Sequence, residues 1–170
     1  MKLFVRIMLA FVLVAFALPL ASSSVAANKT LYKAALSAAN EVHEVVGSTA
    51  RGSFRLGWNT DGSMRFLLSV RGLSGPVTGA HLHAPAGTDA NASVIITLCG
   101  NGPAPAIVAT CTTTPDGLLQ ITGDITSAVL AARNLPSATF VGWLDDGLVY
   151  VNVHTAQNPG GETRGQLVGE

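Results

Sequence analysis

The sequence contains little charge, and the charge that it has is balanced. Only 12% of its 170 residues are charged, with ten basic and ten acidic side chains. The basic residues are scattered, and Arg51, Arg55, Arg65 and Arg71 alternate with other residues as outward positions of strands would. No basic patch of the kind that contacts a phosphate backbone is present, so we expect no nucleic-acid partner.

The sequence also lacks the motifs of common enzymes. No G-x-S-x-G motif surrounds Ser74 or the threonines at 112–114, and no motif places two carboxylates for acid–base catalysis. There is no C-x-x-C redox motif either, because the only two cysteines, Cys99 and Cys111, lie far apart in the chain. These absences predict a protein without catalytic activity.

A long apolar run occurs only at the N-terminus. Lys2 and Arg6 precede and flank an unbroken apolar run at 7–18, and small residues follow at 24–27. The run is shorter than the roughly 20 residues needed to cross a bilayer. We therefore predict a cleaved signal peptide at 1–27 and a secreted domain at 28–170, extracellular or in the periplasm or cell envelope, without a membrane span after cleavage. In that compartment an even number of cysteines predicts a Cys99–Cys111 disulfide across the loop at 100–110.

Short alternating segments separated by turns dominate the rest of the chain. The clearest are 53–58 and 64–71, which flank an Asn/Asp/Gly turn and predict a β-hairpin. Further strands are expected at 30–36 (whose alanines also suit a helix), 77–83, 94–98, 117–125, 140–144, 148–155 and 167–168. Thr126 or Ser127 would cap one short helix at 128–134, and a turn at 145–147 would join 140–144 to 148–155 in a second hairpin. The fold class is therefore all-β: an antiparallel β-sandwich or flattened barrel of about seven or eight strands with one short helix.

Three of the four histidines are placed to share one site. His81 and His83 are two residues apart on an expected strand and so project from the same face. His154 shares the polar face of the last long strand with Tyr150 and Asn152. If these two strands are neighbours, three imidazoles converge, and such a set suits copper or zinc. Ligands about 2.0–2.1 Å from one ion lie roughly 3.5 Å apart, so rings dispersed by more than about twice that distance would exclude the site. The simpler alternative is that each ring only hydrogen-bonds backbone or a carboxylate.

Other polar residues extend this candidate site. His43 is either a surface residue or a fourth ligand in a four-nitrogen site. Glu162 and Arg164 flank Thr163 in a glycine-rich turn, where charge-assisted hydrogen bonds to backbone or to each other would pin the turn. Alternatively, Arg164 would bind or steer an anion beside His154.

Three segments carry a family resemblance. Residues 36–42, residues 72–87 with the His-x-His motif, and residues 150–167 with the Asn-Val-His-Thr and Gly-Gly-Glu-Thr-Arg-Gly-Gln-Leu motifs resemble the CHRD domain first described in chordin. The resemblance covers about 30–168 and implies an all-β, extracellular or envelope module. In chordin such domains accompany modules that bind growth factors. The chain departs from the usual pattern at His43-Glu44, where prolines are typical, and at the Asp-Asp-Gly turn at 145–147.

A fainter likeness is to copper/zinc superoxide dismutases. They also place a His-x-His motif on a strand of a β-sandwich and an arginine in a late glycine-rich loop. The run of zinc-binding histidines and aspartate that such an enzyme needs is absent between His83 and His154. A redox enzyme is therefore the third hypothesis for this site.

The first hypothesis is a CHRD-type binding or structural module for an extracellular or envelope protein or polysaccharide. Its site would be a surface patch of His81, His83 and His154 with Arg164 beside it, extended by Glu162, Asn152 and Tyr150. The second hypothesis is a copper or zinc protein that uses the same histidines. Asn28 and Asn91 begin glycosylation sequons, which matter only if the source glycosylates secreted proteins.

Overall fold

The computed structural model describes residues 29–170. The predicted signal peptide at 1–27 and the sequon at Asn28 lie outside these residues. Among the helices of the described part of the chain, none has both the length and the apolar character that crossing a membrane requires.

The fold is all-β, as the alternating segments predict, and is built on one ten-stranded sheet. The strands lie in the order β6-β5-β4-β8-β9-β1-β2-β3-β7, and β10 pairs with β1. Every ladder is antiparallel except β5–β6, which is parallel. Their bounds are β1 Leu31–Ser37, β2 Arg51–Trp58, β3 Met64–Arg71, β4 Val77–His83, β5 Val94–Gly100, β6 Ala106–Val108, β7 Leu119–Ile125, β8 Tyr150–Thr155, β9 Thr163–Gln166 and β10 Val168–Gly169.

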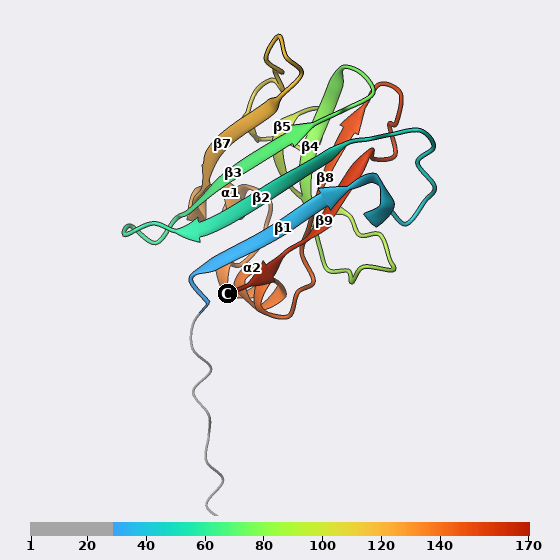
Figure 1. The fold of residues 1–170 in the computed structure, drawn as a ribbon. Coiled ribbons are helices and arrows are strands. Elements are labelled where there is room, and N and C mark those ends of the chain that lie inside the picture. The colour runs from blue at the N-terminus through green and yellow to red at the C-terminus, as the bar shows by residue number, and fades with distance from the viewer. Residues whose placement is uncertain (1–28) are drawn as a thin grey trace, which may run out of the picture.

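The sheet curls until its two edges approach each other. A Cβ added to Gly123 on β7 would lie 2.5 Å from Cγ2 of Ile107 on β6, at the opposite end of the strand order. Figure 1 shows β1, β2, β3 and β7 as one layer across the front, with β4, β5 and β8 behind it. The result is a nearly closed sandwich in which both layers belong to the same sheet.

The β2–β3 hairpin forms as expected and supplies much of the core. Trp58 pairs with Met64 next to the turn, and the ladder continues to Arg51 and Arg71. Phe54 and Phe66 stack with ring centroids 5.8 Å apart, and both are fully or almost fully buried. The four arginines of the hairpin are exposed, as the alternation predicts.

The prediction of a second hairpin from residues 140–144 and 148–155 was wrong. Residues 140–144 belong to helix α2 (Ser137–Asp145), which follows helix α1 (Ser127–Ala132) and precedes β8 directly. Pro136 occupies the N-cap position of α2, and the buried Phe140 and Leu144 are spaced four residues apart, as one face of a helix requires. A short apolar run does not distinguish a strand from a buried helix, which is why the pattern misled. The helix ends before Gly147, whose φ of +67° turns the chain into β8.

The short helix and its cap are confirmed. α1 covers most of the expected range, and the Thr126 side chain accepts a hydrogen bond from the Val129 amide. A single 3-10 turn, η1 (Ala38–Asn40), follows β1.

The Cys99–Cys111 disulfide is also confirmed. Replacing both cysteines with serine is expected to lower the free energy of unfolding by about 3 kcal/mol, because the bridge restricts the unfolded chain across this loop. Urea denaturation of the two proteins measures the difference. Added reductant should shift the midpoint of the wild type and leave that of the double variant unchanged; equal midpoints for both oxidised proteins would contradict the prediction.

Candidate metal centre

The two histidine-bearing strands are direct neighbours in the sheet. β4 pairs with β8 in the register His83↔Tyr150, His81↔Asn152 and Gly79↔His154. His154 therefore lies diagonally across from His81, within reach of a ring. Gly79 makes room for the His81 ring, since a Cβ there would lie 3.1 Å from the His81 Nε2 and Cε1 atoms.

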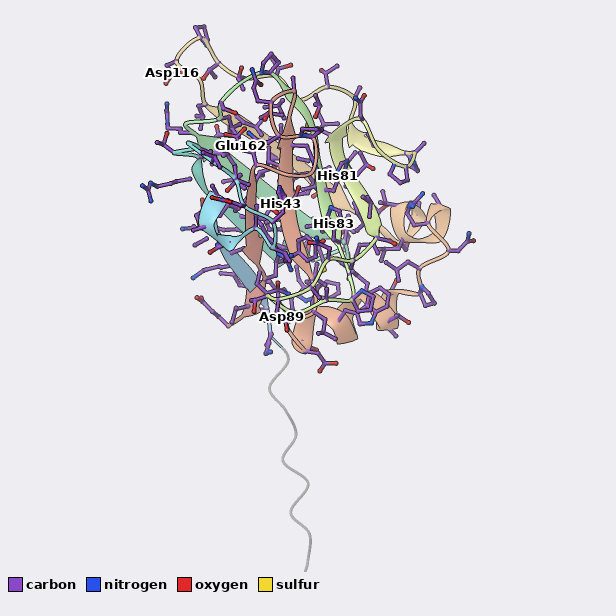
Figure 2. All side chains as sticks on the ribbon, turned by 90° about the vertical axis from the view of Figure 1, so that its right-hand side faces the viewer. His43, His81, His83, Asp89, Asp116 and Glu162 are labelled. Carbon is purple, nitrogen blue, oxygen red and sulfur yellow. A yellow bond between two sulfur atoms is a disulfide. The ribbon has the colours of Figure 1, made fainter. Side chains whose placement is uncertain are left out.

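His81, His83 and His154 converge. Their ring centroids are 4.8 Å apart for His81 and His154, 5.7 Å for His81 and His83, and 6.2 Å for His83 and His154. One ligand nitrogen from each ring lies within 4.8 Å of the others. This separation is below twice the spacing expected around one ion, so the geometry is compatible with a shared site. Figure 2 shows His81 and His83 one above the other along β4.

One nitrogen of each ring forms a hydrogen bond with a backbone carbonyl oxygen. The pairs are His81 Nε2 with Asn101 O at 2.5 Å, His83 Nδ1 with Ala92 O at 2.9 Å and His154 Nδ1 with Pro159 O at 3.0 Å. A carbonyl can only accept, so each of these nitrogens carries the proton and the opposite nitrogen carries a lone pair. Such outer partners orient histidine ligands in metal sites.

The lone-pair nitrogens have no partner in the described part of the chain. His81 Nδ1, His83 Nε2 and His154 Nε2 are all buried without a hydrogen bond. A buried polar atom without a partner costs about 1–3 kcal/mol, so three of them in one group of neighbouring side chains are unusual. Backbone bonding therefore accounts for one nitrogen of each ring and leaves the other three unexplained.

The rings are neutral as well as oriented. Burial lowers the pKa of His83 to about 4 and also lowers the pKa values of His81 and His154. Imidazole binds metals in its neutral form, so the three rings are ready as ligands at physiological pH.

His43 does not belong to this group. Its side chain is 42% exposed, its Nε2 lies 3.1 Å from the Gly161 carbonyl oxygen, and its Nδ1 lies 3.9 Å from a carboxylate oxygen of Glu41. The structure thus brings together three of the four histidines and leaves the fourth at the rim, on the segment after η1.

Tyr150 and Arg164 form a stack on one side of the centre. The Tyr150 ring is parallel to that of His83 at 4.7 Å, and the Arg164 guanidinium carbon lies 3.5 Å from the centre of the Tyr150 ring. The Tyr150 hydroxyl accepts a hydrogen bond from the amide of Ala92, the residue whose carbonyl holds His83. Tyr150 thus supports both the ring of His83 and its outer partner.

Most of the expected surface patch is buried, and only His154 is partly exposed. His81 is 7% exposed, His83 8% and Arg164 1%. Arg164 lies beside Tyr150 and donates to Asn91 Oδ1 and to the Gly87 carbonyl. Glu162 is fully buried elsewhere and accepts from Ser48, Ser74 and Thr155. Arg164 and Glu162 thus each hold neighbouring segments by hydrogen bonds, as expected, but through separate sets of partners.

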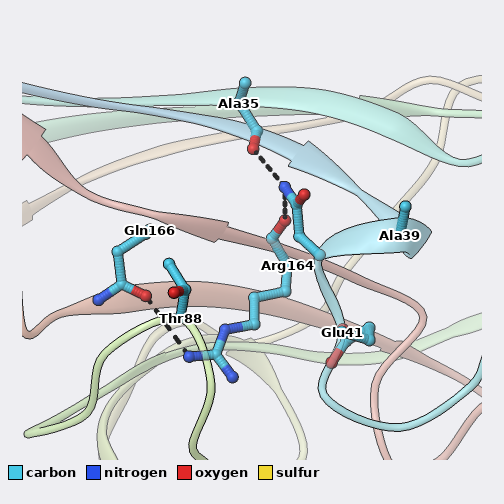
Figure 3. A pocket seen from close by; sticks show the side chains of 7 residues that line it. Ala35, Ala39, Glu41, Thr88, Arg164 and Gln166 are labelled. Atoms are coloured by element: carbon cyan, nitrogen blue, oxygen red, sulfur yellow. Dashed lines mark hydrogen bonds between the residues drawn. The ribbon is translucent and has the colours of Figure 1, made fainter.

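A polar pocket opens next to Arg164, and it contains a residue that the sequence did not single out. The pocket measures about 450 Å³ and is lined by Ala35, Ala39, Asn40, Glu41, Thr88, Arg164 and Gln166 (Figure 3). The Glu41 side chain is 1% exposed and accepts a hydrogen bond from Asn152 Nδ2 at 2.7 Å. Burial raises the pKa of Glu41 to about 7, although Arg164 and Asn152 oppose the shift. Its position in the Asn-Glu-Val motif was the only signal in the sequence.

Comparison with known proteins gives one match. The family model of the CHRD domain matches residues 32–167, nearly all of the described chain. Neither the search of curated proteins nor the search of solved structures returns a match. The matched span contains the His-x-His motif, the Asn-Val-His-Thr strand and the glycine-rich turn, so the chain belongs to the CHRD domain family.

Proposed function

We propose that this CHRD domain is a secreted, non-catalytic module that binds one copper or zinc ion through His81, His83 and His154. The observation that carries the proposal is the set of three buried, neutral ring nitrogens whose lone pairs have no partner in the described chain. A bound ion would satisfy all three at once.

The burial of the site favours a small ligand over a large one. His81, His83 and Arg164 expose little surface, and this supports a small ligand rather than direct contact of these side chains with a protein or polysaccharide. The ligand-type side chains that gather within 4.8 Å are imidazoles alone, with no carboxylate or thiolate among them in the described residues. Three histidines would hold the ion, and the ion would supply Lewis acidity at any open coordination position.

Metal analysis of protein purified without an affinity tag tests this function. After exposure to copper or zinc and removal of the excess, we expect about one equivalent of bound metal in the wild type. His83→Gln should weaken binding by at least about 100-fold, because it removes a buried ligand. The matched control is His43→Gln, which changes the histidine outside the group and should bind as the wild type does.

Less than a tenth of an equivalent in folded wild-type protein would end the proposal, and so would equal effects of the two variants. Superoxide or peroxide turnover by copper-loaded protein addresses catalysis. A rate above that of aqueous copper would contradict the non-catalytic part of the proposal and favour the redox hypothesis.

A further inference from the structure

We propose that this centre selects monovalent copper, Cu(I), over Zn(II) and Cu(II). The inference rests on the proposed function and adds the charge of the ion that the site prefers. It is carried by the charges around the three rings and by the number of ligands that the chain provides.

The first shell and its supports carry no negative charge. The ligands are three imidazoles, and their outer partners are the carbonyls of Asn101, Ala92 and Pro159. Tyr150 packs on His83, and the Arg164 guanidinium packs on Tyr150. The carboxylate of Glu41 lies behind Asn152, whose amide it binds, and is not a member of the ligand group. An ion in this centre would therefore have neutral ligands, and the charged member of the stack beside it is the Arg164 guanidinium, which Glu41 and Asp89 partly offset.

Such surroundings penalise a divalent ion more than a monovalent one. The free energy lost when an ion leaves water grows with the square of its charge, so a divalent ion loses about four times as much as a monovalent ion of the same size. Repulsion from Arg164 grows in proportion to the charge. A thiolate or carboxylate ligand would offset both effects, and this ligand group has neither.

The number of ligands points the same way. Zinc in proteins takes four ligands, with water as the fourth in an open site. Here the three lone-pair nitrogens are buried from solvent, and the fourth histidine is bonded at the rim to Gly161. Cu(I), unlike zinc, is satisfied by three ligands in a plane and needs no fourth. Small inward shifts of the rings would reduce the 4.8 Å span to the roughly 3.5 Å that three such ligands require.

Competition experiments on the full domain test the preference. Anaerobic titration against a chromophoric Cu(I) chelator gives the Cu(I) affinity, and a chromophoric zinc chelator gives the Zn(II) affinity. We expect Cu(I) to bind at least about 100-fold more tightly than Zn(II). Voltammetry compares the two copper states, since each tenfold preference for Cu(I) over Cu(II) raises the potential by 59 mV.

A charge variant links the preference to Arg164. Asn91 accepts a hydrogen bond from Arg164 Nη1 at 3.1 Å, so Asn91→Asp keeps this bond and places a negative charge against the guanidinium. The variant should lower the ratio of Cu(I) to Zn(II) affinity roughly threefold and lower the copper potential. Gln120→Glu adds the same charge to an exposed position on β7 and should change neither.

The outcomes separate the two proposals. Failure of the folded wild type to bind either ion would remove the proposed function. One equivalent of metal with Zn(II) bound as tightly as Cu(I), or a potential no higher than that of aqueous copper, would overturn the Cu(I) preference alone. Equal effects of Asn91→Asp and Gln120→Glu would overturn the role of Arg164 in that preference.

Discussion

Replacing Glu162 with alanine is expected to lower the free energy of unfolding by about 3–5 kcal/mol. Glu162 is fully buried and accepts four hydrogen bonds. Oε1 accepts from Ser48 Oγ and the Ser74 amide, and Oε2 accepts from Ser74 Oγ and Thr155 Oγ1, at 2.6–2.8 Å. The alanine variant would leave these donors buried without partners.

The carboxylate joins segments that are distant in sequence. Ser48 precedes β2, Ser74 follows β3, and Thr155 ends β8. Burial alone would raise the pKa of Glu162, but hydrogen bonds from Thr155, Ser48 and Ser74 outweigh it and hold the pKa below its ordinary value. The Glu162 carboxylate therefore stays ionised at neutral pH. Its hydrogen bonds stabilise the buried negative charge in place of a cation.

Urea denaturation at pH 7 measures the effect. Glu162→Gln should lose less than the alanine variant, because the amide keeps one acceptor while it turns a donor toward the hydroxyls or the Ser74 amide. Glu44→Gln removes an exposed carboxylate from the neighbouring segment and should change the stability by less than about 0.5 kcal/mol. A Glu162→Ala protein with a midpoint close to that of the wild type would show that the hydrogen bonds contribute no net stability.

The sequence predicted the three-histidine group and most strands, but it missed β6, which lies in the loop expected at 100–110, and β9, which lies in the expected glycine-rich turn. Alternation placed His81 and His83 on one face and His154 on another strand, and only the β4–β8 pairing was needed to bring them together. Burial of the site could not be predicted, because it depends on the loops that supply the Asn101, Ala92 and Pro159 carbonyls. These contacts use backbone carbonyls. Every residue has one, so the sequence does not show which of them will contact the rings.

Glu41 and helix α2 were missed for related reasons. Glu41 follows a single turn of 3-10 helix, and its burial against Asn152 depends on strands more than 100 residues away in sequence. In α2 the apolar run from Phe140 to Leu144 satisfies either a strand or a helix, and the space beside the sheet decides between them. Local patterns therefore defined the sheet, while long-range packing defined the pocket and the helix beside it.

The buried histidines of the metal-free protein are expected to lower its stability as the pH falls from 6.5 to 4. His83 has a pKa of about 4 in the folded state and about 6.5 when unfolded. The unfolded state therefore binds more protons in this interval. The contribution of His83 to the free energy of unfolding is fully present above pH 6.5, and it is lost as the pH falls toward the folded pKa. His83 alone accounts for about 3 kcal/mol, and His81 and His154 act in the same direction.

Glu41 has the opposite effect on stability as the pH falls. Variants can therefore separate its contribution to the pH profile from that of the histidines. Its pKa of about 7 lies above the unfolded value near 4.5, so it stabilises the protein as the pH falls from 7 to 4.5. Urea denaturation of metal-free protein from pH 4 to pH 8 should therefore show a steeper acid loss for Glu41→Gln and a shallower one for His83→Gln. Parallel profiles for the wild type and both variants would contradict the assignment. Saturating Cu(I) should raise the upper part of the wild-type profile without changing its slope, because the folded rings are already neutral there and the ion adds a constant stabilisation.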